Sequence, residues 1–134
     1  MSRVRDAMVS EPLSLEASAS ARDAGKRLAD PGVRAVLVCD NGALVGVVTR
    51  KTLVREIVAA GRDPSATRLG DIVEPPIFTL DADRPLEHAF RELEDRDLER
   101  VPVVEGGRLV GILSRAVVQR RLAEDEPVPD EAVR

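Results

Sequence analysis

The pattern of apolar and polar positions along this chain occurs twice. In each occurrence a short alternating stretch comes first, followed by apolar residues at helical spacing, two apolar runs around a Gly-containing turn, and a second helical pattern. Alternation predicts a half-buried strand, and three- and four-residue spacing predicts an amphipathic helix. Asn-Gly or Gly-Gly between two apolar runs predicts a hairpin. The order predicted for each copy is therefore strand, helix, strand, strand, helix.

The first copy is predicted to begin with a helical turn over 2–8 and a strand over 12–15. Its remaining elements are a helix with Ala21, Ala24 and Leu28 buried, strands over 36–39 and 44–48, and a closing helix with Leu53, Val54, Ile57 and Val58 on its apolar positions. The second copy repeats this order with a turn over 67–73, a strand over 77–80, a helix with Leu86, Ala89, Phe90 and Leu93 buried, strands over 101–104 and 109–113, and a closing helix with Val117, Val118 and Leu122.

Three further expectations follow from residue types. Ser18 and Asp83, at equivalent positions, are predicted to cap the first helix of each copy. The Val- and Leu-rich runs predict strands that are buried on both faces. Gly46 and Gly111 interrupt the last strand of each copy, which indicates a close approach to the backbone.

The repeat is also visible residue by residue. The sequence Leu-Val-Gly-Val-Val-Thr-Arg at 44–50 returns as Leu-Val-Gly-Ile-Leu-Ser-Arg at 109–115, an offset of 65 residues (111 minus 46). Such self-similarity predicts that each copy needs the other to bury its apolar face, with ligand-sized clefts between the copies. We expect a first motif over 1–60, a linker over 61–66, a second motif over 67–123 and a disordered acidic tail over 124–134.

Composition narrows the function classes. A chain of 134 residues is long enough to bury an ordinary core. Its single cysteine, Cys39, excludes an intramolecular disulfide and a Cys-rich metal site, and an inert buried thiol is expected. The chain has no run of ~18 apolar residues, so neither a signal peptide nor a membrane span is predicted, and we expect a cytoplasmic protein without a membrane partner.

Charge and aromatic content argue against nucleic acid as a partner. Asp and Glu number 24 against 20 Lys and Arg, so phosphate neutralisation by a basic surface is not expected. Phe78 and Phe90 are the only aromatic residues, too few for base-stacking platforms. His88 and Cys39 lie far apart in the sequence, and there is no pair of nucleophile and base. The chain is therefore not predicted to be an enzyme.

The motifs carry a resemblance to a known family. Asp-Ala-Met near the start, Val-Pro-Val-Val at 101–104, the Gly-Gly turn, and Leu-Val-Gly-Ile-Leu-Ser before a helix resemble tandem cystathionine-beta-synthase (CBS) domains over residues 3 to 122. The resemblance implies an α/β (α+β) fold in which two pseudo-symmetric β-α-β-β-α motifs pack through their sheets into one CBS-pair module. Such modules commonly form dimers and bind AMP, ADP, ATP, S-adenosylmethionine or sometimes NAD between the motifs.

The resemblance also implies site residues. A Thr or Ser at the end of the last strand, here Thr49 and Ser114, holds the ribose together with an Asp three residues later, where this chain has Thr52 and Val117. A basic residue ahead of the second strand contacts the phosphates, here Arg100, with Arg34 beside the equivalent Ala35. The equivalent residues Leu13 and Phe78 complete the candidate nucleotide-binding set. Capping would also explain Thr49 and Ser114, and ordinary solvation or ion pairing would explain the arginines, including Arg50 and Arg115.

Two function classes remain open. The first is a stand-alone regulatory module that senses an adenine nucleotide or related anion, needs no resident cofactor or metal, and modulates a separate partner protein. The second is a ligand-free structural, dimerisation or partner-docking module, which the absence of the ribose-binding Asp from both motifs favours. A homodimer is expected in either case, because one small domain cannot cover two sets of apolar helices.

Overall fold

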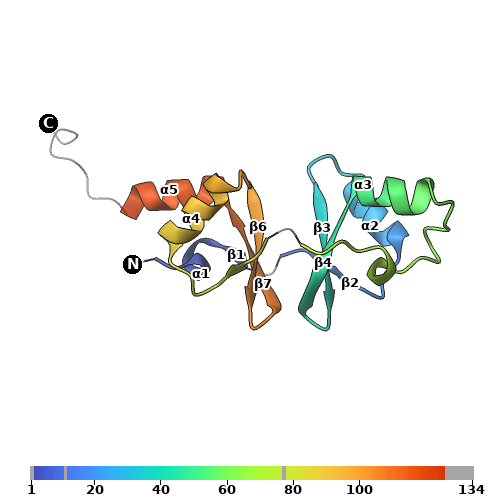
Figure 1. Cartoon of the computed structure of the whole chain (residues 1–134), viewed down its shortest axis with the longest axis horizontal. Coiled ribbons are helices and arrows are strands. Elements are labelled where there is room, and N and C mark those ends of the chain that lie inside the picture. Colours follow the sequence, from blue (N-terminus) through green and yellow to red (C-terminus); the bar gives the residue numbers. More distant parts are fainter. Residues whose placement is uncertain (1, 11, 77, 126–134) are drawn as a thin grey trace, which may run out of the picture. The chain divides into compact units, whose positions relative to one another are not determined.

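The computed structural model describes residues 2–10, 12–76 and 78–125 (Figure 1). Each copy of the repeat folds in the predicted order. After the short helix α1 (Val4–Ala7) and strand β1 (Val9–Ser10), the first copy contains β2 (Ser14–Glu16), α2 (Ala21–Leu28), β3 (Ala35–Asp40), β4 (Ala43–Thr49) and α3 (Arg50–Leu53), which continues as a π-helical stretch over Val54–Val58.

The second copy begins with a 3-10 turn over Leu69–Asp71 in place of α1. It continues with β5 (Leu80–Asp81), α4 (Leu86–Asp95), β6 (Arg100–Glu105), β7 (Arg108–Ser114) and α5 (Arg115–Asp125). The fold is therefore the predicted repeated α/β motif. Of the predicted disordered tail over 124–134, Glu124 and Asp125 belong to α5, and the rest lies outside the described residues.

The N-termini of α2 and α4 show that the predicted caps were wrong. Ser20, and not Ser18, is the N-cap of α2: its side chain accepts a hydrogen bond from the Asp23 amide, and the Asp23 carboxylate accepts one from the Ser20 amide. In the second copy Pro85 occupies the N-cap position of α4, without a side-chain bond. Asp83 lies two residues earlier, where its carboxylate is engaged elsewhere. The reciprocal Ser20–Asp23 bonds satisfy two helix donors, which a cap at Ser18 could not do.

The chain forms two compact units that cross the boundaries of the sequence repeat. Unit 1 comprises Met1–Glu11, Phe78–Glu105 and Val110–Arg134, and unit 2 comprises Pro12–Ile77 and Gly106–Leu109. The leading segment of each copy is the part before its first long helix pattern that carries α1 in the first copy and the 3-10 turn over Leu69–Asp71 in the second. Each leading segment therefore packs with the other copy. Val4 lies in the core of unit 1 and Leu69, its equivalent, in the core of unit 2, and both are fully buried.

The exchanged segments are held by the same backbone bonds in both units. The Val4 and Arg5 amides donate to the Arg84 and Ala82 carbonyls at 2.9 Å. The Leu69 and Gly70 amides donate in the same way to the Ala19 and Ala17 carbonyls, at 2.8 and 2.9 Å. The pairs differ by 65 positions on both sides, so the two units are built on one plan.

Within each unit the helices lie beside the strands. In unit 2, β2 runs parallel to β3, which pairs antiparallel with β4; in unit 1, β5 runs parallel to β6. Figure 1 shows α4 and α5 on one side of β6 and β7. The helices bury their predicted residues, since Ala21, Ala24 and Leu28 of α2 and Leu86, Ala89 and Leu93 of α4 belong to the cores.

Burial on both faces is correct for β3 and wrong for the other long strands. All four residues over 36–39 are buried in β3, whereas β4, β6 and β7 alternate buried with half-buried positions. The closing helix of the first copy also differs from expectation. Ile57 is buried, but Val54 and Val58 are 59% and 73% exposed. The π-helical stretch changes the angular spacing of the side chains, so a 3.6-residue pattern no longer describes the buried face.

Candidate functional site

Thr49 and Thr52 form a closed pair at the start of α3. Thr49 is the N-cap, and its hydroxyl accepts a hydrogen bond from the Thr52 amide at 3.3 Å. The Thr52 hydroxyl accepts one from the Thr49 amide at 3.0 Å and lies 3.1 Å from the Thr49 hydroxyl. Thr52 has no exposed surface, whereas Thr49 is half-buried. The structure therefore gives Thr52 a capping contact, and Thr49 is the hydroxyl of this pair that solvent reaches.

Arg50 follows directly after the cap, and its side chain binds backbone carbonyls. Its guanidinium donates to the Leu28 and Asp30 carbonyls at 2.6 and 2.8 Å, at the carboxyl end of α2. Helix carboxyl ends leave unpaired carbonyls that carry partial negative charge. Arg50 thus ties α3 to α2, and the structure explains it without a ligand.

Arg115, its equivalent in unit 1, has the same tying role with a different partner. It forms ion pairs with Glu99 and, at 3.4 Å, with Asp97 in the segment after α4. Its amide also donates to the Glu99 carbonyl at 2.8 Å. The geometry therefore supports the simpler interpretation, in which Arg50 and Arg115 pair with groups of the chain itself.

Arg100 and Ser114 lie together in unit 1. Arg100 opens β6 and Ser114 ends β7, and the bond between their neighbours Arg115 and Glu99 holds these two strand ends side by side. Ser114 is half-buried and Arg100 is exposed. The Arg100 side chain makes no hydrogen bond or ion pair with any described residue, so its guanidinium is available to an anion. Val117, in the first turn of α5, is half-buried.

Phe78 belongs to the same unit and precedes β5, which pairs with β6. It packs against the core of unit 1 and is half-buried. The guanidinium carbon of Arg96 lies 4.2 Å from the centre of its ring, a cation–π contact. One face of the ring therefore already has a partner.

The corresponding residues of unit 2 are more open. Arg34 is exposed and makes no hydrogen bond or ion pair with the described residues. Ala35 pairs with Thr49 across β3 and β4, which brings Arg34 near the Thr49 cap. Leu13 is 76% exposed. The seven candidate residues thus fall into two sets, each within one unit: Arg100, Ser114 and Phe78 in unit 1, and Arg34, Thr49, Thr52 and Leu13 in unit 2.

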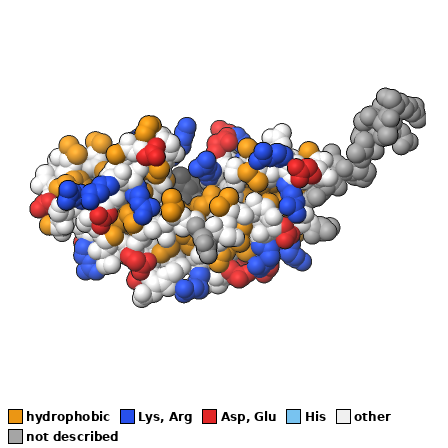
Figure 2. Space-filling view, turned by 180° about the vertical axis from the view of Figure 1, so that it is seen from behind, with side chains coloured by type: hydrophobic (Ala, Val, Ile, Leu, Met, Phe, Trp, Pro, Cys, Tyr) orange, Lys and Arg blue, Asp and Glu red, His pale blue; other side chains and the backbone are white. Residues whose placement is uncertain are grey.

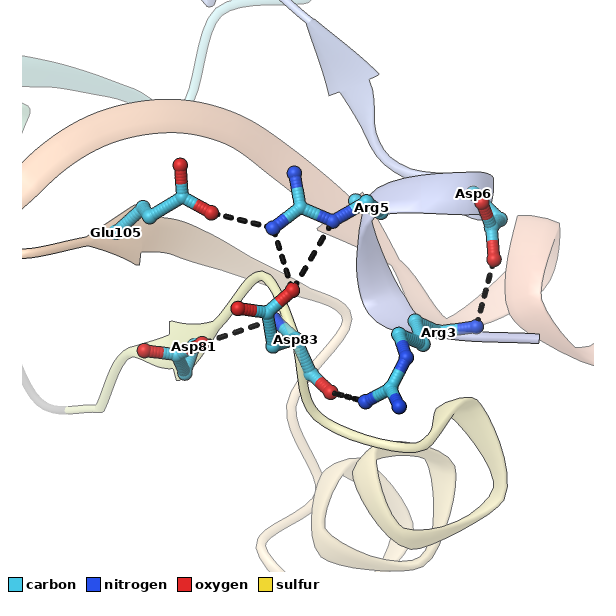
Figure 3. Close-up of polar contacts among 6 residues, drawn as sticks. All are labelled: Arg3, Arg5, Asp6, Asp81, Asp83 and Glu105. Carbon is cyan, nitrogen blue, oxygen red and sulfur yellow. Dashed lines mark hydrogen bonds and ion pairs between the residues drawn. The ribbon is translucent and has the colours of Figure 1, made fainter. Parts of the chain in front are cut away.

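A polar network in unit 1 was not foreseen from the sequence (Figure 3). Arg5 donates to the Asp83 carboxylate at 2.5 and 3.1 Å and also pairs with Glu105. The Arg3 guanidinium donates to the Asp83 carbonyl at 2.5 Å, and the Asp83 amide donates to the Asp81 carboxylate at 2.8 Å. These contacts join the leading segment to the loop before α4 across some 78 residues, a separation at which no local sequence signal exists.

The network shifts the ionisation of its members. The hydrogen bonds from Arg5 hold the pKa of the Asp83 carboxyl below its ordinary value of 3.8. The same bonds raise the pKa of Arg5, chiefly through Asp83 and then through Glu105. In unit 2 the position of Arg5 is Gly70, so the network has no counterpart there.

Cys39 has the expected character of an inert thiol. It is a free cysteine, buried in β3, and burial raises its pKa above that of an ordinary free thiol. A thiol of this kind is a poor nucleophile at neutral pH. In the described part of the chain no group of His, Cys, Asp and Glu side chains is arranged to hold a metal ion. Within the same residues, none of the helices has the length and apolar character needed to cross a membrane.

One face of the molecule mixes charges of both signs. The face shown in Figure 2 carries Lys and Arg, Asp and Glu, and hydrophobic side chains interspersed. Such a surface differs from the basic stripe that phosphate-backbone binding uses.

Comparison with known proteins gives consistent results. Hypoxic response protein 1 of Mycobacterium tuberculosis is 30% identical over 102 residues, which are 75% of this chain and 71% of that protein. Its crystal structure, described with two coordinated zinc ions, has a TM-score of 0.74 at 26% identity and covers 90% of this chain and 99% of that one. The crystal structure of CBSX2 in complex with AMP has a TM-score of 0.72 at 28% identity and covers 95% and 100% of the two chains.

The sequence profile of the CBS domain matches the chain twice, over residues 4–59 and 69–124. The two matches follow the two copies of the repeat and include the leading segments that the units exchange. Together with the repeated β-α-β-β-α order and the similar solved structures, they show that the chain belongs to the CBS domain family as a CBS pair.

Proposed function

We propose that this protein is a stand-alone regulatory module that binds an adenine nucleotide and modulates a separate partner protein. The similarity to the CBSX2 structure in complex with AMP, over 95% of this chain, is the observation that carries the proposal. The candidate residues add support, because the Arg100 guanidinium, which has no hydrogen-bond or ion-pair partner among the described residues, lies beside the half-buried Ser114. The proposed ligand is AMP, ADP, ATP or S-adenosylmethionine, and the protein itself performs no reaction.

Phosphate recognition would be unequal in the two units. In unit 1 the guanidinium stands at the strand opening itself, at Arg100, while the equivalent position in unit 2 is Ala35. A planar guanidinium can donate two parallel bonds to a phosphate, and such charge-assisted bonds are strong. Arg34 would reach a phosphate only from the neighbouring position. We therefore assign the tighter site to unit 1.

Ribose recognition would be weak in both units. Val117 has no polar atom to accept bonds from the ribose hydroxyls, and the Thr52 hydroxyl is buried against Thr49. A carboxylate at position 117 would supply two acceptor oxygens beside Ser114. Loss of this acceptor supports the second candidate function, a ligand-free dimerisation or partner-docking module.

Titration calorimetry with AMP and adenosine tests the proposal. Arg100→Ala should weaken AMP binding on the order of tenfold to a hundredfold and leave adenosine binding nearly unchanged, because only AMP offers phosphate oxygens. Arg34→Ala should have a smaller effect. Val117→Asp should strengthen binding of both ligands by restoring the diol acceptor.

Arg68→Ala is the matched control, since Arg68 is an exposed arginine outside both candidate sets. No detectable binding of any of the four proposed ligands to the wild-type protein would favour the docking module. Equal losses of AMP and adenosine affinity in Arg100→Ala would show that Arg100 does not contact phosphate.

We also propose that the protein is a homodimer. Val54 and Val58 remain largely exposed on the closing helix of unit 2, and covering them with a second copy would remove apolar surface from water. Sedimentation equilibrium tests the proposal: a mass that stays at 14.5 kDa at all concentrations contradicts it.

A further inference from the structure

The segment that leads from α4 into β6 and the equivalent segment that leads from α2 into β3 carry opposite net charges. Residues 91–100 include five acidic and three basic residues, whereas residues 26–35 include one acidic and three basic residues. The exchange is direct beside the candidate sites: Glu99 stands where the first copy has Arg34. Asp97 stands where the first copy has Gly32. The approach to the candidate site is therefore acidic in unit 1 and basic in unit 2.

Asp97 and Glu99 lie where β6 begins and β7 ends, which is the place of the candidate site of unit 1. Glu99 directly precedes Arg100, and its carbonyl accepts the Arg115 amide at 2.8 Å. Arg115 directly follows Ser114. Both carboxylates form ion pairs with the Arg115 guanidinium. Two negative charges thus share one positive charge, and one negative charge remains in excess at this strand opening.

Both carboxylates remain accessible to an incoming ligand. The side chains of Asp97 and Glu99 are 92% and 72% exposed. The neighbouring cation Arg96 is engaged with the Phe78 ring, 4.2 Å from its centre. Arg100 makes no hydrogen bond or ion pair with the described residues. A phosphate chain bound there would therefore meet the Arg100 guanidinium and the excess negative charge together.

We propose that Asp97 and Glu99 restrict the nucleotide site of unit 1 to a monophosphate, so that AMP binds there in preference to ADP and ATP. The inference rests on the nucleotide binding proposed above and names the ligand of one site. One phosphate is matched by the Arg100 guanidinium, whereas each further phosphate adds negative charge that the carboxylates repel. Unit 2 has Arg34 and Gly32 at the equivalent positions, so its site should accept longer phosphate chains.

Calorimetric titration of the full chain with AMP and with ATP tests the selectivity. Arg34→Ala serves as the background, because it removes the cation beside the candidate residues of unit 2. Divalent cations are omitted, since they would neutralise the phosphates. The measured quantity is the dissociation constant of ATP divided by that of AMP. Asp97→Asn/Glu99→Gln should lower this ratio on the order of threefold to tenfold, as expected for exposed charges.

Arg115→Gln should change the ratio in the opposite direction, because it leaves both carboxylates without their cation. A merely structural role would weaken AMP and ATP binding alike and would leave the ratio unchanged. Glu87→Gln/Glu124→Gln is the matched control. It removes two exposed carboxylates of unit 1, in the first turn of α4 and the last turn of α5, at the ends of these helices away from Asp97 and Arg115. The control should leave the ratio unchanged.

Salt checks that the selection is electrostatic. The ratio in the Arg34→Ala background should fall as the salt concentration rises, because salt screens repulsion between exposed charges. A ratio that does not respond to Asp97→Asn/Glu99→Gln or to salt, or ATP binding tighter than AMP in that background, overturns the selectivity and leaves nucleotide binding standing. A wild-type protein that binds neither AMP nor ATP overturns the proposed nucleotide binding as well.

Discussion

Gly46 and Gly111 lack a side chain for the same physical reason. A Cβ on Gly46 would lie 2.0 Å from the Glu74 carbonyl oxygen, and one on Gly111 would lie 2.8 Å from the Val9 carbonyl oxygen and 2.6 Å from the Met8 sulfur. In both units the segment after the leading turn crosses the last strand at this glycine, where Val47 bridges Glu74 and Ile112 pairs with Val9. The close approach predicted from the two glycines is confirmed, and the approaching group is backbone.

Gly46→Ala should therefore destabilise the protein by about 1 to 3 kcal/mol, because the obstructing atom belongs to backbone that cannot turn away. Gly111→Ala should cost less, because the Val9 carbonyl oxygen would lie 2.8 Å from the added Cβ, against 2.0 Å for the Glu74 carbonyl oxygen at Gly46, and the Met8 side chain can move aside. Urea unfolding measures both. Gly25→Ala is the control and should be neutral or slightly stabilising, as it is in an open helix position. Equal midpoints for Gly46→Ala and Gly25→Ala would contradict the interpretation.

Two leading segments of similar backbone geometry are secured by different side chains. In unit 2, Gly70 lies close to Ala17: a Cβ there would meet the Ala17 side chain and carbonyl at 3.3 Å. In unit 1 the equivalent Arg5 reaches outward to Asp83 and Glu105. Arg5 and these carboxylates are substantially exposed, so salt and solvent screen the pairs. The network is thus expected to orient α1 more than to stabilise the whole unit.

The stability that Asp83 contributes should depend on pH. Its folded pKa is lowered by Arg5, so the contribution is present above the ordinary value of 3.8 and is lost as the pH falls through the folded pKa. We expect the wild type to exceed Asp83→Asn in free energy of unfolding at pH 6, with a difference that shrinks below pH 3.8. Denaturant titrations across this range measure it.

Asp95→Asn provides the matched control for that series. Asp95 is an exposed aspartate at the end of α4 whose carboxylate makes no hydrogen bond or ion pair with the described residues. Its substitution should leave the pH dependence of stability unchanged. A pH-independent difference between wild type and Asp83→Asn would show that the carboxylate contributes nothing through its charge.

For the whole molecule, ligand binding and stability are linked. A ligand that binds only the folded state stabilises it by about 2.7 kcal/mol at a hundred times its dissociation constant. AMP should therefore raise the melting temperature of the wild type by several degrees, and of Arg100→Ala by less at the same concentration. Inorganic phosphate at equal ionic strength is the control. An unchanged melting temperature at millimolar AMP, ADP, ATP and S-adenosylmethionine would support the docking module instead.

The fold was largely predictable because its signals are local. The hairpins over β3–β4 and β6–β7 were expected from Asn41-Gly42 and Gly106-Gly107, and all four residues have the positive φ that such turns require. The predicted cap of α2 and the predicted buried face of the closing helix were wrong, because both depend on contacts or helix geometry that the residue pattern does not show. Ser20 replaces Ser18 as cap because Asp23 completes a reciprocal pair, and the π-helical stretch moves Val54 and Val58 to the surface.

The positions of the candidate residues could be predicted from the sequence, but their hydrogen-bond partners and their burial could not. The resemblance placed Arg100, Ser114, Thr49 and Arg34 at strand ends, and the structure locates them there. It could not say which arginines are free, because Arg50 and Arg115 find partners on loops that only folding brings near. Nor could it say that Thr52 is buried, since a hydroxyl three residues after a cap can point either to the cap or to solvent.

The sequence by itself determined the repeated unit, the order of its elements and the family, because periodicity, turn residues and the 65-residue offset are properties of neighbours along the chain. Only the tertiary structure decided that the leading segments are exchanged, that Val4 and Leu69 enter each other's copy, and that Arg5 meets Asp83 and Glu105. A segment of a few residues packs equally well by pattern against either copy. Which copy it joins depends on the backbone carbonyls that accept its amides and on the glycine that lets it cross the last strand of the other copy.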